Sequence, residues 1–237
     1  MKRLVLIELA VLLTASYAQA QFSFGARAGI NITQVSVVDK SAKDLTVKEN
    51  SEMKPGIQLG VVGEYTFSNG FGIQPSVFFY MHRYELYRIA GTVGALDLII
   101  EHRETSNINY LQIPVNAQYK LGLGKIKLLF QAGPYLGIAL NGKQKRESHI
   151  IEIIRGNPDD EYLKFFEHPK NDKIIFGTED RELKRLDYGL GLGAGVQLGN
   201  IQTVIGYNKG LVNLSNSSWY SQKNISFSVY LAYLFGN

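Results

Sequence analysis

Apolar and polar residues alternate along eight stretches of the chain with a period of two, which is typical of β-strands. In one clear stretch, residues 57–67, Ile57, Leu59 and Val61 share one face and Gln58 lies on the other. Because successive side chains of a strand point to opposite sides of a sheet, each stretch predicts a strand with one apolar and one polar face. The eight stretches are 22–33, 57–67, 71–81, 111–120, 126–138, 190–198, 201–207 and 225–235.

The connections between these stretches alternate strictly between short and long. The short ones are hairpin-turn signals: Asn69-Gly70, Gly122-Leu123-Gly124 and Gly199-Asn200. The long, polar ones are Val35–Met53, Arg83–Glu104, Asn141–Leu183 and Asn213–Gln222. In bacterial outer-membrane barrels the short turns are periplasmic and the long loops face outward. We therefore predict an all-β fold, an eight-stranded antiparallel up-and-down transmembrane β-barrel over residues 21–237, with both termini in the periplasm.

Residues 1–20 have the organisation of a secretory signal peptide. Lys2 and Arg3 supply the positive start, Leu4–Leu13 is the apolar core, and a small-x-small site predicts cleavage between Ala20 and Gln21. A membrane-anchoring helix is the alternative, but spanning a bilayer takes about 20 apolar residues. The chain has no cysteine, so a lipid anchor and disulfides are excluded. We expect export, removal of the leader and a final location in the cell outer membrane.

A soluble periplasmic ligand-binding β-barrel is an alternative, because alternation alone does not say which face lies inside. Two features favour the membrane. The polar faces are rich in Gln, Asn, Gly and Ser, which suits a crowded lumen, and aromatic residues gather near strand ends, as an interfacial girdle requires. These aromatic residues are Phe22, Phe24, Tyr65, Phe67, Phe71, Tyr119, Tyr233 and Phe235. A net charge of only +4 argues against nucleic acid as a partner.

Four segments carry a similarity to a known family: Phe24–Asn31, Tyr110–Val115, Ala132–Gly137 and Asp187–Gly195, with Tyr207–Leu211 as a weaker fifth. On these segments the chain resembles the PorT-like outer-membrane β-barrel family of Bacteroidetes-type, Gram-negative bacteria, across essentially the whole mature length. The resemblance implies an eight-stranded barrel in the outer membrane. It also implies a link to protein secretion and gliding machinery, through the family's namesake, and it brings no catalytic residues.

Five charged side chains are predicted to point into the lumen: Arg27, Glu64, Lys120, Lys127 and Asp187. Eight strands leave an interior filled by side chains, and buried charges must pair or bind water. We therefore expect a charge-paired plug and no open pore. A proton-binding or ligand-binding site inside the barrel is the alternative.

Candidate enzymatic chemistry is sparse. The histidines His82, His102, His149 and His168 lack the spacing of a helical zinc pair, so we predict no metal or cofactor. A barrel-embedded lipid-modifying enzyme is a further alternative. His82 at a strand end, with Ser76 before it, is the nearest approach to a catalytic pair, and nothing nominates a third member. We expect the protein not to be an enzyme.

The longest loop, 141–183, is dense in charged residues and must be mostly solvated. Within it, Asn157-Pro158-Asp159-Asp160-Glu161 has a helix-start signature. Tyr162, Phe165 and Phe166 would then form an apolar stripe on a short helix, and the flanking runs Ser148–Ile154 and Lys173–Phe176 could pair as strands. The helix either folds over the barrel mouth or offers its aromatic side chains to a partner.

The expected function is a structural or partner-binding role. The expected partners are outer-membrane lipid and a protein that contacts the extracellular loops or the periplasmic face.

Overall fold

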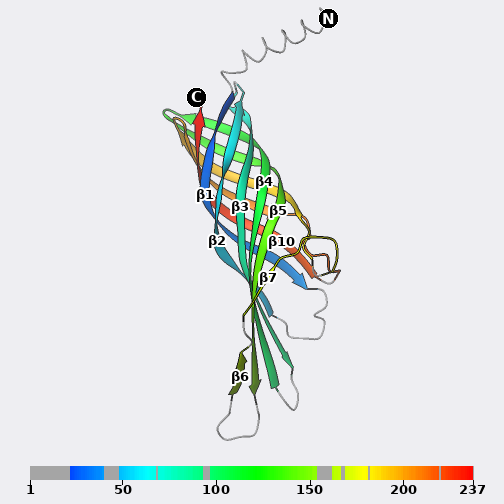
Figure 1. Cartoon of the computed structure of the whole chain (residues 1–237). Helices are drawn as coiled ribbons and strands as arrows, with labels where there is room; N and C mark the ends of the chain where they lie inside the picture. The colour runs from blue at the N-terminus through cyan, green and yellow to red at the C-terminus, as the bar shows by residue number, and fades with distance from the viewer. Residues whose placement is uncertain are drawn as a thin grey trace, which may run out of the picture.

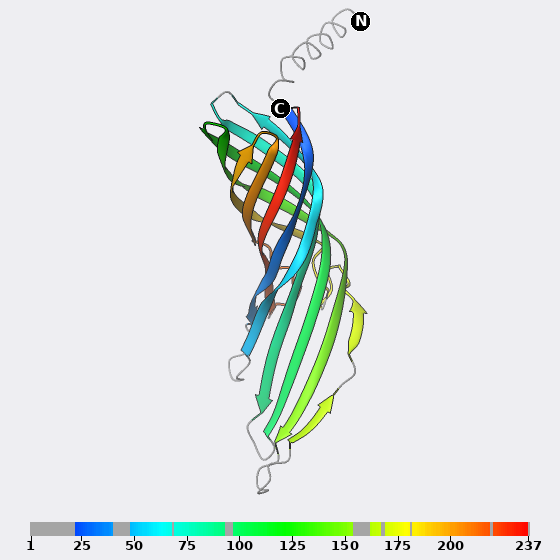
Figure 2. The same ribbon diagram turned by 90° about the vertical axis from the view of Figure 1, so that its left-hand side faces the viewer.

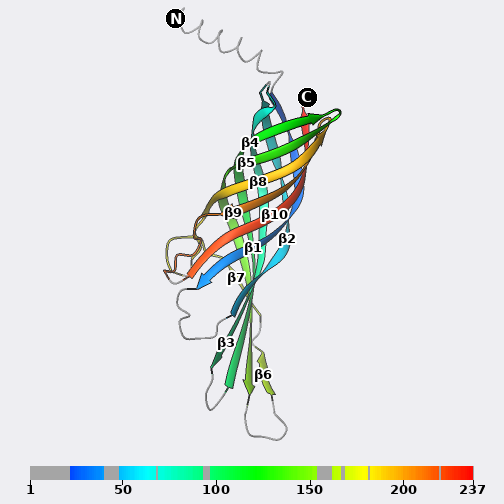
Figure 3. The same cartoon turned by 180° about the vertical axis from the view of Figure 1, so that it is seen from behind.

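In the computed structural model, eight antiparallel strands of the described residues close into a ring (Figures 1 and 3). The described residues are 22–39, 48–67, 69–92, 97–153, 162–166, 169–180, 182–218 and 220–236. The strands are β1 (Phe22–Asp39), β2 (Lys48–Thr66), β3 (Phe71–Thr92), β4 (Asp97–Leu123), β5 (Ile126–Ile153), β6 (Tyr162–Phe166), β7 (Lys170–Lys173), β8 (Leu186–Leu198), β9 (Ile201–Gly210) and β10 (Tyr220–Phe235). The ring runs β1–β2–β3–β4–β5–β8–β9–β10, and β10 pairs back with β1. The predicted eight-stranded up-and-down barrel is confirmed.

The apolar face of each strand points outward and the polar face points into the ring. Ile30, Leu59 and Leu192 are 65%, 61% and 63% exposed, whereas the polar neighbours Asn31 and Gln58 are each 2% exposed. A soluble barrel would bury the apolar set instead. The outer wall is therefore suited to lipid and the inner wall to a packed polar lumen, as in transmembrane barrels.

Three glycines with positive φ make the short turns, as the sequence predicts. Gly70, Gly124 and Gly199 have φ angles of 85°, 65° and 56°. In the first turn the Asn69 side chain also accepts a hydrogen bond from the Phe71 amide at 3.2 Å. β1 starts and β10 ends at the same rim as these turns (Figure 1).

Aromatic side chains lie around this short-turn rim. Phe24 and Phe235, on neighbouring strands, lie with ring centroids 5.5 Å apart, and Phe71 and Tyr119 lie 4.8 Å apart. Aromatic side chains prefer the boundary between lipid and water, so these rings mark the edge of the apolar wall on the side of the short turns.

Strands β3, β4 and β5 continue far beyond the opposite rim as a projecting sheet (Figure 2). They have 22, 27 and 28 residues, whereas β8 and β9 have 13 and 10. Crossing a bilayer takes only about 9–11 residues of strand. The outer halves of β3–β5 therefore stand outside the membrane, with β7 and β6 paired along β5.

This projecting sheet corrects the predicted outer loops. Most of Arg83–Glu104 is strand, and the expected long loop after Asn141 starts with twelve further residues of β5 that end at Ile153. In Arg83–Glu104 the outward positions Arg83 and Glu85 are charged, whereas the inward Tyr84 and Leu86 are apolar and buried. The outward apolar face of the membrane-spanning part therefore does not continue, and its alternation gives no signal there.

The predicted helix within the 141–183 loop is wrong where it can be checked. Tyr162–Phe166 is strand β6, which pairs with β5, and residues 154–161 lie outside the described residues. The expected strand extension is confirmed for Ser148–Ile153, which belongs to β5 and pairs with β4 and β6. Lys173, at the end of β7, pairs with Lys143 instead of this run. The open edge of the long β5 supplies backbone partners, which outweigh local helix signals.

Two further points concern the signal peptide and membrane-spanning helices. The predicted signal peptide and its cleavage site at Ala20 and Gln21 lie outside the described residues. Among the residues that are described, none belongs to a helix of the length and hydropathy that a bilayer crossing needs.

An apolar cluster closes the barrel at its outer end. Tyr84, Leu86, Ile108 and Tyr110 are among its members, and Ile174, Phe176 and Leu183 pack against the cluster. The cluster separates the polar lumen from the space above it. The buried core comprises Val35, Phe78, Tyr80, Tyr84, Leu86, Ile108, Tyr110 and Ala139, with Val37, Ile174, Phe176 and Leu183 against it.

Candidate functional site

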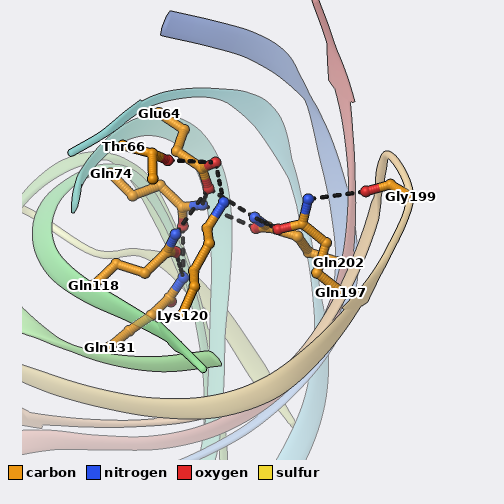
Figure 4. A network of polar contacts seen from close by, with 9 residues as sticks. All are labelled: Glu64, Thr66, Gln74, Gln118, Lys120, Gln131, Gln197, Gly199 and Gln202. Atoms are coloured by element: carbon orange, nitrogen blue, oxygen red, sulfur yellow. Dashed lines mark hydrogen bonds and ion pairs between the residues drawn. The ribbon is translucent and has the colours of Figure 1, made fainter. Parts of the chain in front are cut away.

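Glu64 is the centre of a polar network that fills the lumen near the short-turn rim (Figure 4). The side chain is 1% exposed and forms an ion pair with Lys120 through Oε1. Its Oε2 accepts hydrogen bonds from the amides of Gln118 (2.9 Å), Gln202 (2.7 Å) and Gln74 (3.0 Å). A carboxylate held by a cation and several N–H donors is a strong arrangement for a buried charge.

A ring of glutamine side chains extends this network around the barrel. Gln131 donates to Gln118 at 2.6 Å and to Gln74 at 2.8 Å, and Gln202 donates to Gln197 at 3.1 Å. These glutamines come from five strands, β3, β4, β5, β8 and β9, and Glu64 adds β2 as a sixth. The side chains therefore occupy the cross-section of the barrel at this level.

Arg27 lies farther from the short-turn rim than the network does. It has no carboxylate partner among the described residues. It is 4% exposed, donates to Gln58 Oε1 at 2.7 Å, and is sandwiched between two rings. Its guanidinium carbon lies 4.0 Å from the Phe78 centroid and 3.7 Å from the Tyr230 centroid. Cation–π contact replaces the ion pair that the sequence leads us to expect.

Asp187 is the opposite case, a buried carboxylate with no cation bound to it in the described part of the chain. Its Oδ2 accepts hydrogen bonds from Asn224 Nδ2 at 2.9 Å and from the Tyr135 hydroxyl at 3.3 Å. Its Oδ1 has no hydrogen-bond partner. The single charge-paired plug expected from sequence is thus one tight pair, Glu64–Lys120, and two separate unpaired charges.

Lys127 does not join the buried set. It is exposed at the short-turn rim, one residue after the start of β5. Its side of the strand faces inward, but the lumen already opens to solvent at that level. Period-two alternation predicts the face of a residue and says nothing of its depth.

His82 and Ser76, the nearest approach to a catalytic pair, both point into the barrel but lie far apart. Six residues of extended strand separate them by about 20 Å. The buried His82 ring makes edge contacts with the rings of Tyr84 and Tyr110, at 5.7 Å and 6.3 Å. Over the described residues, no group of three or more His, Asp or Glu could hold a metal ion.

Sequence reasoning missed the inward glutamines, which contribute most of the lumen network. The signal was present, because Gln74, Gln118, Gln131, Gln197 and Gln202 all occupy polar-face positions near the short turns. Alternation assigns each of them to a general polar face and does not identify any of them as a partner of the charges.

A cavity of about 740 Å³, here called the outer cup, lies above the apolar cluster. Its walls are the inner face of the projecting sheet on one side and the segments 173–183 and 215–222 on the other. A cavity of this size is typical of small-molecule sites. The lining residues are Tyr84, Leu86, His102, Glu104, Ser106, Gln144, Arg146, Lys173, Ile174, Ile175, Glu179, Asp180, Glu182, Leu183, Ser215, Ser217, Tyr220 and Gln222.

One side chain fixes the turn that forms a wall of the outer cup. The Asn216 amide nitrogen lies within hydrogen-bond distance of the carbonyl oxygens of Gly177 (3.0 Å), Glu179 (3.2 Å) and Glu182 (3.1 Å). Glu182 also accepts a hydrogen bond from the Glu179 amide at 3.0 Å. The turn is therefore held in shape by contacts with the β9–β10 connection.

The outward face of the projecting sheet carries a charged cluster just above the apolar wall. Lys54 lies 2.9 Å from Glu85, and Arg103 lies 3.2 Å from the other oxygen of the same carboxylate. The hydrogen bond to Glu85 is the main cause that raises the pKa of Lys54. These contacts tie β2, β3 and β4 together where they leave the membrane.

Tyr162, Phe165 and Phe166, the predicted partner contacts, lie on β6 at the far end of the projecting sheet. Their backbone pairs with β5, so they belong to a sheet edge and not to a helix. A role for them in partner contact stays a prediction.

An apolar outer wall, a filled polar lumen and tight turns on one rim define an outer-membrane β-barrel protein. Residues 17–216 match the sequence family described as outer membrane protein beta-barrel domain, and the chain belongs to that family. Comparison with curated protein sequences found no significant match.

Solved structures of small barrels are also similar to this chain. Ail, the attachment invasion locus protein of Yersinia pestis, shares 14% identity over 91% of this chain and 99% of its own, with a TM-score of 0.37. OprG of Pseudomonas aeruginosa shares 14% over 91% and 96%, with a TM-score of 0.39. Neisserial surface protein A shares 14% over 90% and 97%, with a TM-score of 0.35. No functional residue is carried over from these proteins.

Proposed function

We propose that this protein is a non-conducting, non-enzymatic outer-membrane barrel that holds a rigid binding surface for a protein partner outside the cell. The observation that carries the proposal is the asymmetry of the strands. β4 and β5 have more than twice as many residues as a membrane crossing needs, and β8 and β9 have barely enough.

The absence of conduction is supported by the filling of the lumen. The Glu64 network crosses the barrel at one level and the apolar cluster fills it at another. Between them, the two cavities found among the described residues have volumes of only about 30 and 10 Å³. Spaces of this size admit one or two water molecules and no larger solute.

The absence of enzymatic activity is supported by the placement of the candidate groups. Ser76 and His82 are both buried inside the barrel, about 20 Å apart along β3, where neither reaches lipid or the outer cup. Ser76 and His82 therefore do not supply a nucleophile–base pair at the membrane surface for the lipid-modifying alternative.

The binding role is supported by the organisation outside the membrane. Ordered strands, charged cross-strand contacts and a clamped turn maintain a sheet and a cup where a barrel alone needs only flexible loops. Rigid surfaces bind with a smaller entropic cost than flexible loops. The PorT-like resemblance of the sequence makes a component of a secretion apparatus the first partner to test.

A photo-crosslinking amino acid at Lys145, exposed on the outward face of β5, tests this proposal in living cells. The matched control is Lys125, an exposed lysine in a short turn at the opposite rim. We expect a discrete protein adduct from position 145 that disappears when residues 88–101 are replaced by a two-residue turn. No adduct at 145, or one that survives this shortening, contradicts the proposal.

A further inference from the structure

Two buried charges of opposite sign in the barrel lack ion-pair partners. Arg27 and Asp187 are each 4% exposed, and among the described residues neither forms a salt bridge. An isolated charge in a low-dielectric interior is strongly unfavourable, so both need compensation. The direct contacts described above supply dipoles and rings but no counter-charge.

The two charges lie on two small cavities that share part of their walls. Arg27 lines a cavity of about 30 Å³ and Asp187 lines one of about 10 Å³. Gln112, Tyr135 and Asn208 line both cavities. One water molecule needs about 10–15 Å³ measured in this way, so the first cavity has room for about two and the second for one.

Buried polar atoms without partners converge on these cavities. Arg27 Nε is unpaired on the first cavity, and Asp187 Oδ1, Asn224 Oδ1 and both ring nitrogens of His82 are unpaired on the second. A water molecule in the second cavity can donate to the two oxygens and accept from the His82 N–H, which gives it three hydrogen bonds, the usual number for a buried water. Unsatisfied buried groups in this number are rare in native proteins unless water satisfies them.

We propose that ordered water occupies both cavities and joins Arg27 to Asp187 as a solvent-separated ion pair, so that the middle of the lumen is a built water-binding site. This site is independent of any partner bound outside the cell. Water fits better than an ion, because the two protein charges already balance. A cation beside Asp187 would face Arg27 across the shared wall, and an anion beside Arg27 would face Asp187.

A double-mutant cycle tests the coupling. Arg27→Gln, Asp187→Asn and the double variant are unfolded in urea from lipid vesicles, and the folded fraction is followed by migration on unboiled gels. Each single variant leaves one charge uncompensated, so we expect each to raise the unfolding equilibrium constant at least about tenfold. If the two charges are coupled, the double variant should raise the unfolding equilibrium constant by about tenfold less, or still less, than the product of the two single effects. Strict additivity would overturn the proposal.

Gly137→Ala tests whether water mediates this coupling. Gly137 lines the second cavity, and a Cβ there would lie 3.4 Å from Tyr110 and 3.5 Å from Asp187, so a methyl group fits and removes the space for water. We expect the coupling to fall in this background. Gly63→Ala is the control, since its Cβ would meet Phe22 and Pro75 on the outer wall at 3.6 Å. Coupling that persists in Gly137→Ala contradicts a water-mediated pair.

A change of salt separates water from a bound cation. Sodium chloride is replaced by choline chloride at equal ionic strength. The resulting shift of the unfolding midpoint should be the same for the wild-type protein and for Asp187→Asn. A sodium-dependent midpoint that requires Asp187 would overturn the proposal in favour of a cation site.

Discussion

Gln202 and Glu64 are 138 positions apart in the chain, yet the Gln202 amide donates a hydrogen bond to the Glu64 carboxylate at 2.7 Å across the lumen. Glu64 stands on β2 and Gln202 on β9, which are not neighbours in the ring. The bond can therefore form only when the barrel has closed. An intact Glu64 network is therefore a sign that the whole ring of strands has closed.

Removing the cation of this network should be costly. Lys120→Met leaves the buried Glu64 carboxylate with amide donors alone, and breaking one side of a buried pair typically costs about 3–5 kcal/mol. We expect a clear decrease in the urea midpoint of unfolding from lipid vesicles. Lys127→Met is the matched control, because Lys127 lies on the same inward side near the same rim but is exposed. Its free energy of unfolding should change by less than about 0.5 kcal/mol. Equal effects of the two substitutions would mean that the pair is not buried as described.

Arginine placed on the outer wall should discriminate lipid from water. Ile205, in the middle of β9, and Ile175, beside the outer cup, are both 64% exposed. Ile205→Arg should cost about 2–4 kcal/mol if the side chain faces the bilayer core, and Ile175→Arg should cost little. Folding into vesicles of phosphatidylcholine, followed by gel migration and tryptophan fluorescence, measures both. A soluble barrel would tolerate the two substitutions to a similar degree.

The clamp on the outer cup can be released without affecting the barrel. Asn216→Ala removes the amide that contacts three carbonyl oxygens of the 177–182 turn. We expect faster proteolysis of this turn on intact cells, several-fold by mass spectrometry, because local opening becomes easier. The midpoint of barrel unfolding should stay the same. Ser218→Ala, an exposed neighbour, serves as the control, and equal proteolysis of the two variants would show that Asn216 does not hold the turn.

The short turns should differ in their tolerance of alanine. Gly70 and Gly124 both have positive φ, which disfavours alanine by about 1–2 kcal/mol. At Gly70 a Cβ would also lie 2.8 Å from the carbonyl oxygen of Lys120, whereas at Gly124 it would meet nothing within 4 Å. We therefore expect Gly70→Ala to lower the unfolding midpoint more than Gly124→Ala. The reverse order would indicate that the first turn relaxes at no cost.

The barrel itself was predictable because the bilayer imposes a simple rule on its wall. Residues such as Leu59 must contact lipid, and their neighbours such as Gln58 must fill the lumen, so the period of two is strong in the sequence. Glycines at Gly70, Gly124 and Gly199 then mark the turns. Local sequence carries all of this information.

The projecting sheet and the pairing of the charges were not predictable in the same way. Around Glu104 both faces of β4 carry polar side chains, so the sequence shows no contrast between the faces. The choice of partner is a matter of three-dimensional closure, since Arg27 meets Phe78 and Tyr230 from distant strands instead of a carboxylate. Alternation predicts the side of the strand on which each charge lies but not its depth, so the expectation that Lys127 lies inside the lumen is wrong.

The projecting sheet also has a mechanical consequence. The outer part of β4, from Asp97 to Asn109, is about 40 Å long at the usual rise of a strand. It continues into the barrel wall without an intervening loop, and its pairing with β5 shifts register at Asn109 and Tyr110. A pull on the tip acts along the strands and loads many backbone hydrogen bonds in shear at the same time. The sheet has the geometry of a stiff post and not of a tether, so a pull by the partner proposed above would pass through it directly into the outer membrane.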